Sequence, residues 1–296
     1  MKAWILAARP KTLPAAIVPV WVGSMPLLVD GDSGTGSWWL FWCTLASCLC
    51  IQIATNLFND AIDFEKGSDT DKRLGPRRVT ASGLLTKRSV MIGALGFCVL
   101  AAVISIPLIQ MRGWPIVAVG MVSLFFAYGY TGGPFPLAYR GMGELFVILF
   151  FGLVAVIVSY YVQTGGWGDR VVWILALQCG LYSCVLITIN NLRDIEEDGG
   201  TGKRTAAVRF GKTFARWEIA AFCLVPLLLW LWVFRQTGAT TMDWLLLALI
   251  FVPLAGVIVR NVFKVEPSAA YNKFLALGAV QLLCFGSYAA LVIAGK

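Results

Sequence analysis

Two short polar runs interrupt an otherwise apolar chain of 296 residues, and each combines carboxamides with carboxylates at helical spacing. The spacing is i, i+4 and i+7 in the first run and i, i+4 and i+8 in the second, so each set is predicted to share one face of a helix. The residues are Asn56, Asp60 and Asp63 in the first run and Asn190, Asp194 and Asp198 in the second. Hard oxygen ligands of this kind suit Mg²⁺, which is typically shared with substrate phosphates. The two runs therefore predict a diphosphate held through magnesium.

The elements that carry these runs are predicted to be membrane spans, because each run ends an apolar stretch long enough to cross a bilayer. Carboxylates beside hydrocarbon are costly, which favours a functional role for them. The whole chain is 58% hydrophobic and 14% charged, with a mean hydropathy of +0.77. This composition excludes a soluble domain of the same length. We therefore expect an all-α polytopic membrane protein.

Nine apolar windows are long enough for a hydrocarbon core of about 30 Å. They cover residues 13–29, 38–57, 90–110, 114–130, 143–163, 171–190, 217–234, 243–263 and 274–294. The first window contains Pro14, Pro19 and Pro26 and is expected to be kinked, because proline lacks a backbone donor. Eight or ten spans are compatible with the same pattern.

The distribution of basic residues predicts the orientation of these spans. If the N-terminus and alternate loops share one side, that side holds 20 of the 24 Lys and Arg residues, and only Arg112, Arg170, Arg235 and Lys296 lie opposite. The positive-inside rule makes the richer side cytoplasmic. We expect an integral protein of a bacterial-type inner membrane, with its N-terminus and both acidic runs facing the cytoplasm. Orientation accounts for most of the net charge of +8, so no nucleic-acid partner is expected.

The remaining reactive residue types narrow the chemistry further. The chain contains no histidine, which excludes histidine-based triads, haem ligation by histidine and histidine-bound zinc. All eight cysteines fall inside predicted spans without paired C-x-x-C spacing, so they are expected to pack as small apolar side chains.

The two acidic runs also suggest an internal repeat. Asn56 and Asn190 are 134 residues apart, and each run is followed by a basic loop that contains glycine. We predict a single transmembrane domain over residues 1–296, made of two pseudo-repeat halves at roughly 1–140 and 141–296. In that arrangement the two runs face each other across a central cavity.

Several stretches of this sequence resemble the UbiA superfamily of intramembrane prenyltransferases. The resemblance is carried by residues 9–14 (RPKTLP), 56–78 and 190–211, and it continues through residues 128–131 and 141–144. It spans about three quarters of the chain. The paired aspartate runs are typical of the superfamily, whereas the runs GSDTDKRLGPR and GKRT resemble the branch that prenylates 1,4-dihydroxy-2-naphthoate in menaquinone biosynthesis.

The resemblance implies about nine helices around a central cavity that opens to the cytoplasm and sideways to lipid. It implies magnesium-dependent transfer of a polyprenyl group from prenyl diphosphate to 1,4-dihydroxy-2-naphthoate, with release of pyrophosphate and CO₂, giving demethylmenaquinol. The carboxylates implied to be catalytic, and to hold two Mg²⁺ ions, are Asp60, Asp63, Asp194 and Asp198. The carboxamides implied to complete or orient the metal shells are Asn56, Asn59, Asn190 and Asn191.

Other side chains are implied to bind the two substrates. Those that would neutralise the diphosphate are Lys66, Arg73, Arg77, Arg193, Lys203 and Arg204. Those that could hold the carboxylate of the aromatic acceptor are Arg9, Tyr139 and Arg140, although Arg9 and Arg140 could equally anchor the chain at the membrane boundary. An allylic cation also needs a dry, aromatic cavity, and the candidate rings are Phe125, Phe126, Tyr128, Tyr130, Phe146, Phe150, Phe151, Tyr160 and Tyr161. For Glu144 we expect helix capping or an ion pair with Arg140 rather than catalysis.

Two alternatives stay open at this point. A sister prenyltransferase acting on 4-hydroxybenzoate, homogentisate or haem would carry the same aspartate runs. A cation-coupled transporter would also combine intramembrane carboxylates with a two-part repeat, but such carriers place their carboxylates near the membrane midplane rather than at span ends. The sequence leaves the prenyl chain length and the oligomeric state open.

Overall fold

The computed structural model describes residues 1–30, 36–69, 74–76 and 78–295, and within these ranges all regular structure is helical. The helices of the first half are α1 (Lys2–Ala8), α2 (Pro14–Gly23), α3 (Pro26–Asp30), α4 (Trp38–Glu65), α5 (Lys87–Ile104), α6 (Ile106–Arg112) and α7 (Trp114–Gly129). Those of the second half are α8 (Gly143–Val147), α9 (Ala155–Thr164), α10 (Arg170–Arg193), α11 (Ile195–Gly200), α12 (Ala206–Thr237), α13 (Thr241–Leu246), α14 (Val252–Lys264) and α15 (Tyr271–Ala294). Short 3₁₀ turns cover Pro10–Thr12 and Leu137–Tyr139, and π-helical segments join α8 to α9 (Ile148–Val154) and α13 to α14 (Leu247–Phe251).

The all-α membrane class predicted from the sequence is confirmed. In the described residues, seven helical segments are long and apolar enough to cross a membrane, and an eighth is added if the bent pair Lys2–Thr12 and Pro14–Gly23 counts as one span. The fourth predicted window forms α7, an apolar helix of 16 residues that is about 24 Å long. It is shorter than a full span, so the number nine stays a prediction.

The first predicted window is bent, and proline marks both breaks. The axis turns by 52° between Lys2–Thr12 and Pro14–Gly23, and the helix ends again before Pro26. Pro14 and Pro26 are the first residues of α2 and α3. Proline costs no hydrogen bond at this position, because the N–H groups of the first helical turn have no partner within the helix. Pro19 lies inside α2.

Local sequence signals fix where several spans begin and end. The side chains of Thr86, Asp169 and Thr205 accept backbone N–H bonds at the first turns of α5, α10 and α12. Gly165 and Gly238 end α9 and α12 in the left-handed conformation, which glycine adopts without a steric penalty. These caps lie in connecting segments, so each span keeps its apolar length intact.

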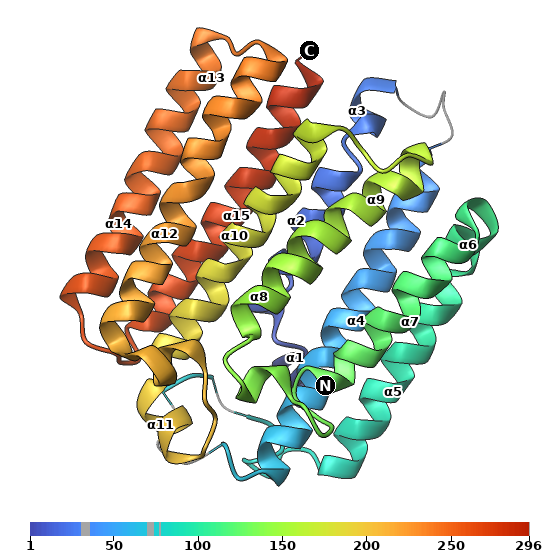
Figure 1. Cartoon of the computed structure of the whole chain (residues 1–296). Coiled ribbons are helices and arrows are strands. Elements are labelled where there is room, and N and C mark those ends of the chain that lie inside the picture. Colours follow the sequence, from blue (N-terminus) through green and yellow to red (C-terminus); the bar gives the residue numbers. More distant parts are fainter. Residues whose placement is uncertain (31–35, 70–73, 77, 296) are drawn as a thin grey trace.

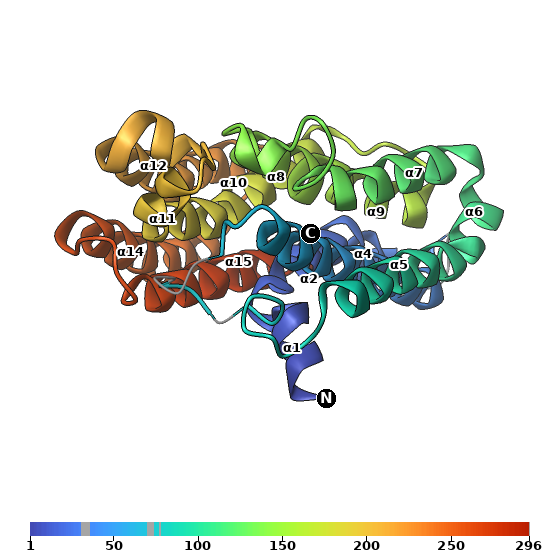
Figure 2. The same cartoon turned by 90° about the horizontal axis from the view of Figure 1, so that it is seen from below.

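The helices form two rows when they are viewed along the bundle (Figure 2). One row contains α12, α10, α8, α9 and α7, and the other contains α14, α15, α2, α4 and α5. Figure 1 shows that the N-terminus, α11 and the connection from α4 to α5 lie at one end of the bundle, opposite α3, α6, α13 and the C-terminus. Since α4 has 28 residues and is about 42 Å long, it outreaches a hydrocarbon core of about 30 Å. Its last turns, which carry the first acidic run, lie at this polar end.

Two glycines allow the helix α10 to approach the π-helical segment Ile148–Val154 closely. A Cβ on Gly152 would stand 2.6 Å from the carbonyl oxygen of Ala176 and 2.8 Å from the Cα of Gly180. Small residues at such crossings let helix backbones pack against each other in membranes. This contact joins α8 and α9 to α10, and so positions one wall of the cavity described below.

The substitution Gly152→Ala is therefore expected to destabilise the protein, because backbone atoms of α10 cannot move aside for the new methyl group. We expect a loss of about 1–3 kcal/mol, seen as a lower melting temperature of the detergent-solubilised protein. The matched control is Gly96→Ala in α5, where an added Cβ meets no atom of the described residues within 4 Å. Equal melting temperatures for the two variants would contradict the close-packing argument.

Candidate active site

A cavity of about 520 Å³ lies between the two rows of helices. Both acidic runs contribute to its walls, the first through Asn56, Asn59 and Asp60 and the second through Asn190 and Asn191, whereas Asp63, Asp194 and Asp198 are not among the lining residues. Its polar lining includes Arg9, Lys11, Thr12, Asn56, Asn59, Asp60, Arg78, Tyr130, Glu144, Asn190, Asn191, Arg193, Lys203 and Asn272. A second, apolar cavity of about 160 Å³ shares Ala15, Gln52, Thr55, Phe146 and Phe151 with the first. The site thus joins a charged end to an apolar extension among the spans.

The first acidic run lies on the last turns of α4, as predicted, and Asp60 is its most buried member together with Asp63. The two carboxylate oxygens of Asp60 accept hydrogen bonds from the backbone N–H groups of Val79 (3.2 Å) and Thr80 (2.9 Å). Asp60 therefore ties the loop that follows α4 to the end of that helix. Since a carboxylate has about four lone-pair sites, these bonds leave it able to bind a cation as well.

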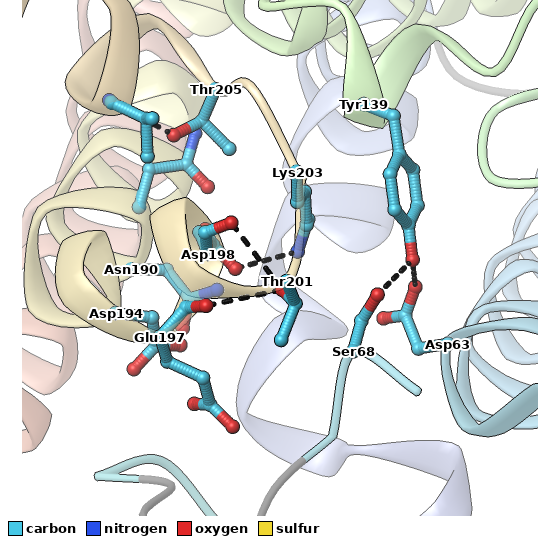
Figure 3. A network of polar contacts seen from close by, with 12 residues as sticks. Asp63, Ser68, Tyr139, Asn190, Asp194, Glu197, Asp198, Thr201, Lys203 and Thr205 are labelled. Carbon is cyan, nitrogen blue, oxygen red and sulfur yellow. Dashed lines mark hydrogen bonds and ion pairs between the residues drawn. The ribbon is translucent and has the colours of Figure 1, made fainter. Parts of the chain in front are cut away.

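Asp63 is held by side chains from two other segments. The hydroxyl of Tyr139 donates to Asp63 Oδ1 at 2.8 Å and lies 2.7 Å from the hydroxyl of Ser68 (Figure 3). Arg78 Nη2 lies 3.4 Å from Asp63 Oδ2, and Arg78 Nε donates to Asp69 at 3.1 Å. Burial and the nearby Asp63 raise the pKa of Tyr139 well above its usual value, so its hydroxyl stays protonated and donates.

The carboxamides of the first run hold the N-terminal segment in place. Asn56 Nδ2 donates to the carbonyl of Ala8 (3.0 Å) and to Thr12 Oγ1 (3.1 Å). Asn59 Oδ1 accepts from Arg9 Nη2 at 2.6 Å, while its amide donates to Thr131 at 3.1 Å. Arg9 itself has a φ of 51°, a left-handed conformation that is uncommon for a residue other than glycine. These amides orient the N-terminal wall of the cavity, which the spacing alone did not predict.

The second acidic run continues across a helix break. The helix α10 ends at Arg193 and α11 begins at Ile195, but the backbone bonds from Asp194 N to Asn190 O and from Asp198 N to Asp194 O keep the i, i+4 succession. The single helix predicted for Asn190, Asp194 and Asp198 is therefore wrong, since Asp194 separates two helices. The three side chains nonetheless stay at one end of the bundle.

Arg193 forms a buried clamp on this second run. Its Nε and Nη2 donate to the two oxygens of Asp194 at 2.7 and 2.6 Å, and Nη2 also reaches Asn190 Oδ1 at 2.6 Å. Its Nη1 donates to Asn272 Oδ1 at 2.8 Å, and Asn272 bonds in turn to the carbonyl of Leu74. Arg193 is 2% exposed, so a bidentate charged pair of this kind fixes Asp194 firmly.

Asp198 is the least satisfied carboxylate of the second run. Lys203 Nζ lies 3.4 Å from Asp198 Oδ1, and among the described residues no group donates to its buried Oδ2 atom. Figure 3 shows Asp198 and Lys203 across from Tyr139 and Asp63, of which Asp63 comes from α4 in the other row. Burial raises the pKa of Asp198 to about 6, with Lys203 opposing the shift and Asp194 adding to it. A buried oxygen without a donor suits a cation or the water of a hydrated cation.

The shift at Asp198 predicts a pH-dependent need for magnesium. A raised pKa means that the folded protein holds this proton up to about pH 6, so a bound cation must displace it below that pH. Between pH 7 and pH 5 the ionised fraction falls about tenfold, and we expect the Mg²⁺ concentration for half-maximal turnover to rise by a similar factor. Titrations with Mg²⁺ at several pH values would test this. A half-maximal concentration that does not change with pH would contradict the assignment of Asp198 as a ligand.

The cationic residues predicted for the diphosphate fall into three groups. Lys203 and Arg193 line the cavity. Lys66 lies outside its lining, donates to the carbonyl of Thr131 at 2.8 Å and stands 4.0 Å above the Tyr139 ring, and burial lowers its pKa. Arg204 is exposed and does not line the cavity. Arg73 and Arg77 lie outside the described residues.

The three residues predicted to hold the aromatic acceptor are also separated. Arg9 lines the cavity, whereas Tyr139 does not line it and donates a hydrogen bond to Asp63. Arg140 is exposed and stacks on the Phe135 ring at 3.7 Å, so it is not a wall residue. The ion pair expected between Glu144 and Arg140 is wrong, because Glu144 turns inward and accepts a hydrogen bond from Asn191 Nδ2 at 2.8 Å.

Some of the predicted aromatic rings surround the cavities. Tyr130, Phe146 and Phe151 line the main cavity, and Phe126 and Phe150 join Phe146 and Phe151 in the second. Phe146 stacks on Phe150 with ring centroids 4.3 Å apart. By contrast, Phe125 and Tyr128 are exposed and line neither cavity. All eight cysteines are free thiols.

Two polar side chains of this site have no recognisable signal in the sequence. Arg78 is buried between Asp63 and Asp69, and Asn272 joins α15 to Arg193 and to the loop after α4. Arg78 stands in a loop without periodicity beside three other basic residues, and Asn272 stands just before a span without a neighbouring motif. Only their positions in space identify them.

The oxygen donors of the site bear on the predicted magnesium. Among the described residues no group of three or more Asp, Glu, Cys or His side chains could by itself enclose a metal ion. An open arrangement agrees with Mg²⁺ chemistry, because Mg²⁺ retains waters and is shared with substrate phosphates. The buried Oδ2 atom of Asp198 without a donor also fits. The side chains present are thus compatible with Mg²⁺ bound together with a diphosphate.

Known proteins of one family are similar to this chain. The model of the UbiA prenyltransferase family matches residues 16–281. A 1,4-dihydroxy-2-naphthoate octaprenyltransferase of Mycobacterium tuberculosis is 38% identical over 224 residues, which cover 72% of this chain and 71% of that protein. The enzyme of the same name from Bacillus subtilis is 33% identical over 249 residues, covering 83% and 77%.

Solved structures show the same fold. A UbiA homologue from Archaeoglobus fulgidus, bound to GPP and Mg²⁺, superposes with a TM-score of 0.68 at 15% identity and covers 98% of this chain and 99% of its own. A homologue from Aeropyrum pernix gives a TM-score of 0.67 at 13% identity, covering 94% and 95%. With a family model that spans most of the chain and relatives above 30% identity, this protein belongs to the UbiA prenyltransferase family.

Proposed function

We propose that this protein transfers a polyprenyl group from prenyl diphosphate to 1,4-dihydroxy-2-naphthoate, releasing pyrophosphate and CO₂ and giving demethylmenaquinol. The observation that carries the proposal is that side chains of both acidic runs (Asn56, Asn59 and Asp60; Asn190 and Asn191) line one cavity beside basic side chains, with an apolar extension among the spans. The names of the relatives support the naphthoate as acceptor.

The chain's own residues would bind the diphosphate at the polar end of the cavity. Lys203 and Arg78 line this end and carry positive charge that can neutralise phosphate oxygens. Two Mg²⁺ ions, the number that the resemblance implies, would be held by Asp60, Asp63, Asp194 and Asp198. Asn190 would complete their coordination shell. When bound, magnesium would stabilise the negative charge that develops on the departing pyrophosphate. Arg193, through its bonds to Asp194 and Asn272, would keep the second run in position.

The apolar extension would hold the isoprenoid chain and exclude water from the allylic cation. Tyr130, Phe146 and Phe151 present aromatic faces to the cavity, and such faces stabilise a cation. Arg9 is placed in the wall of the cavity, where it could pair with the acceptor carboxylate. The excess of basic residues at the end that carries both runs supports a cytoplasmic position for this end in a bacterial inner membrane.

The test is a product assay on the purified full chain in detergent. The protein is incubated with 1,4-dihydroxy-2-naphthoate, 4-hydroxybenzoate or homogentisate, with prenyl diphosphates of several lengths, and with either Mg²⁺ or EDTA. We expect mass spectrometry to detect a prenylated, decarboxylated naphthoquinol in the reactions that contain Mg²⁺ and not in those that contain EDTA. If only another acid is prenylated, the proposed acceptor is wrong and the prenyl transfer reaction stands. If no acceptor gives a product, the proposed prenyltransferase activity is refuted.

A further inference from the structure

The cavity wall carries one carboxylate that the proposed metal and diphosphate chemistry does not use. Glu144, the second residue of α8, is 6% exposed and lines the main cavity. Asp63, Asp194 and Asp198 each pair with a basic side chain. In the part of the chain that the structure describes, Glu144 has no such ion pair. A buried carboxylate without a cation is costly, so a function for it is worth seeking.

The helix α10 holds Glu144 through both its side chain and its backbone. Asn191 Nδ2 donates to Glu144 Oε1 at 2.8 Å, so the amide of Asn191 is directed at Glu144. The thiol of Cys184 donates to the backbone carbonyl of Glu144 at 3.2 Å. A Cβ on the preceding Gly143 would lie 3.1 Å from the hydroxyl of Tyr130, so this turn packs tightly against the end of α7. Glu144 is thus oriented rather than loosely placed.

The charge of Glu144 restricts what it can bind. A carboxylate repels both a diphosphate and the carboxylate of an aromatic acid, and the basic residues Arg9, Lys11, Arg78 and Lys203 line the same cavity, where they can pair with anionic groups instead. A ring hydroxyl of the aromatic acceptor, in contrast, is a neutral donor that forms a short, strong hydrogen bond to a carboxylate. The chemistry of the wall therefore matches a phenolic hydroxyl at this position.

We propose that Glu144 binds the hydroxyl beside the reacting ring carbon of the aromatic acceptor and takes its proton during prenylation; this inference rests on the proposed function. As the ring carbon that bears the carboxylate forms a bond to the allylic carbon, the carbon–oxygen bond of the diphosphate breaks and pyrophosphate leaves. The π pair of the ring double bond beside the hydroxyl forms the new carbon–carbon bond, the oxygen supplies the pair of the C=O bond as its O–H bond breaks, and the proton passes to Glu144. When the carboxylate leaves as CO₂, its bonding pair restores the ring and the oxygen takes the proton back. Glu144 ends the cycle ionised, and the prenyl group has replaced CO₂.

The test compares Glu144→Gln with a matched control, Glu218→Gln. Glutamine keeps the shape of Glu144 and can still accept from Asn191, but it cannot take a proton. Glu218, in α12, is a second carboxylate with a buried oxygen among the spans; it lines neither cavity but interacts electrostatically with Glu144, so it controls for the loss of a nearby charge outside the cavity. We expect Glu144→Gln to lower kcat by about 100-fold. The dissociation constant of prenyl diphosphate, measured through tryptophan fluorescence, should stay within about twofold of the wild-type value in both variants. The kcat of Glu218→Gln should also stay within about twofold of the wild-type value.

An acceptor analogue separates this role from a structural one. In the analogue the hydroxyl beside the carboxylate is methylated, so it offers no proton to Glu144. We expect the wild type and Glu144→Gln to prenylate the analogue at similar low rates, whereas they differ about 100-fold with the natural hydroxyl. Equal losses with both acceptors, or a Glu144→Gln variant within threefold of the wild type, would overturn the inference. A wild type that is inactive toward the naphthoate would instead count against the proposed function itself.

Discussion

The substitution Asp198→Asn is expected to lower turnover by about 10²–10³-fold, with little change in folding. Asp198 offers a buried oxygen without a donor in the described residues and pairs with Lys203 through its other oxygen. Asparagine keeps the size of the side chain but loses the negative charge that would hold Mg²⁺ beside the diphosphate. Because the charge that the folded protein must bury also disappears, the melting temperature should not fall. Initial rates and thermal unfolding in detergent measure both quantities.

The control for this variant is Glu196→Gln, two residues earlier on the same short helix. Glu196 is exposed and pairs with Lys212 at 3.1 Å, and surface pairs of this kind contribute little. We expect this variant to keep wild-type turnover and the wild-type requirement for Mg²⁺. If Asp198→Asn also keeps most of its activity, Asp198 is not a metal ligand.

The substitution Asp60→Asn is expected to disturb both chemistry and the loop that follows α4. Both oxygens of Asp60 accept backbone N–H bonds, from Val79 and Thr80. An asparagine amide would turn an N–H group toward one of these donors and leave it unsatisfied, at a cost of about 1–3 kcal/mol. We therefore expect turnover to fall by about 10²-fold or more, together with faster hydrogen exchange in residues 79–85.

The matched control is Glu65→Gln, five residues along the same helix. Glu65 is largely exposed and pairs with Lys87 at 2.7 Å, so neither the rate nor the hydrogen exchange of residues 79–85 should change. If Asp60→Asn loses turnover without faster hydrogen exchange, Asp60 acts in metal binding and does not support the loop. Faster exchange with full turnover would make it purely structural.

The carboxamides show how far helical spacing alone could be used. Asn56 stands on the predicted face of α4 and Asn59 follows three residues later, but their partners are Ala8, Thr12, Arg9 and Thr131, which come from segments far away in the sequence. Spacing predicts which side chains share a face and does not predict which other segment meets that face. For the same reason, helical spacing pairs Glu144 with its neighbour Arg140, although a side chain of α10 binds it.

Sequence alone determined the class of this protein, its acidic runs and its family resemblance. These depend on local quantities: the length of apolar windows, the i, i+4 periodicity and short motifs such as the run from Asn56 to Asp63. The tertiary structure alone decided that both runs share one cavity, that Arg193 clamps Asp194, and that Arg78, Asn272 and Glu144 belong to the site. These residues meet only because α10 and α15 pack beside α4 and the N-terminal segment. Burial and charge pairing depend on contacts between segments that are far apart in the sequence. Such contacts leave no local pattern from which they could be predicted.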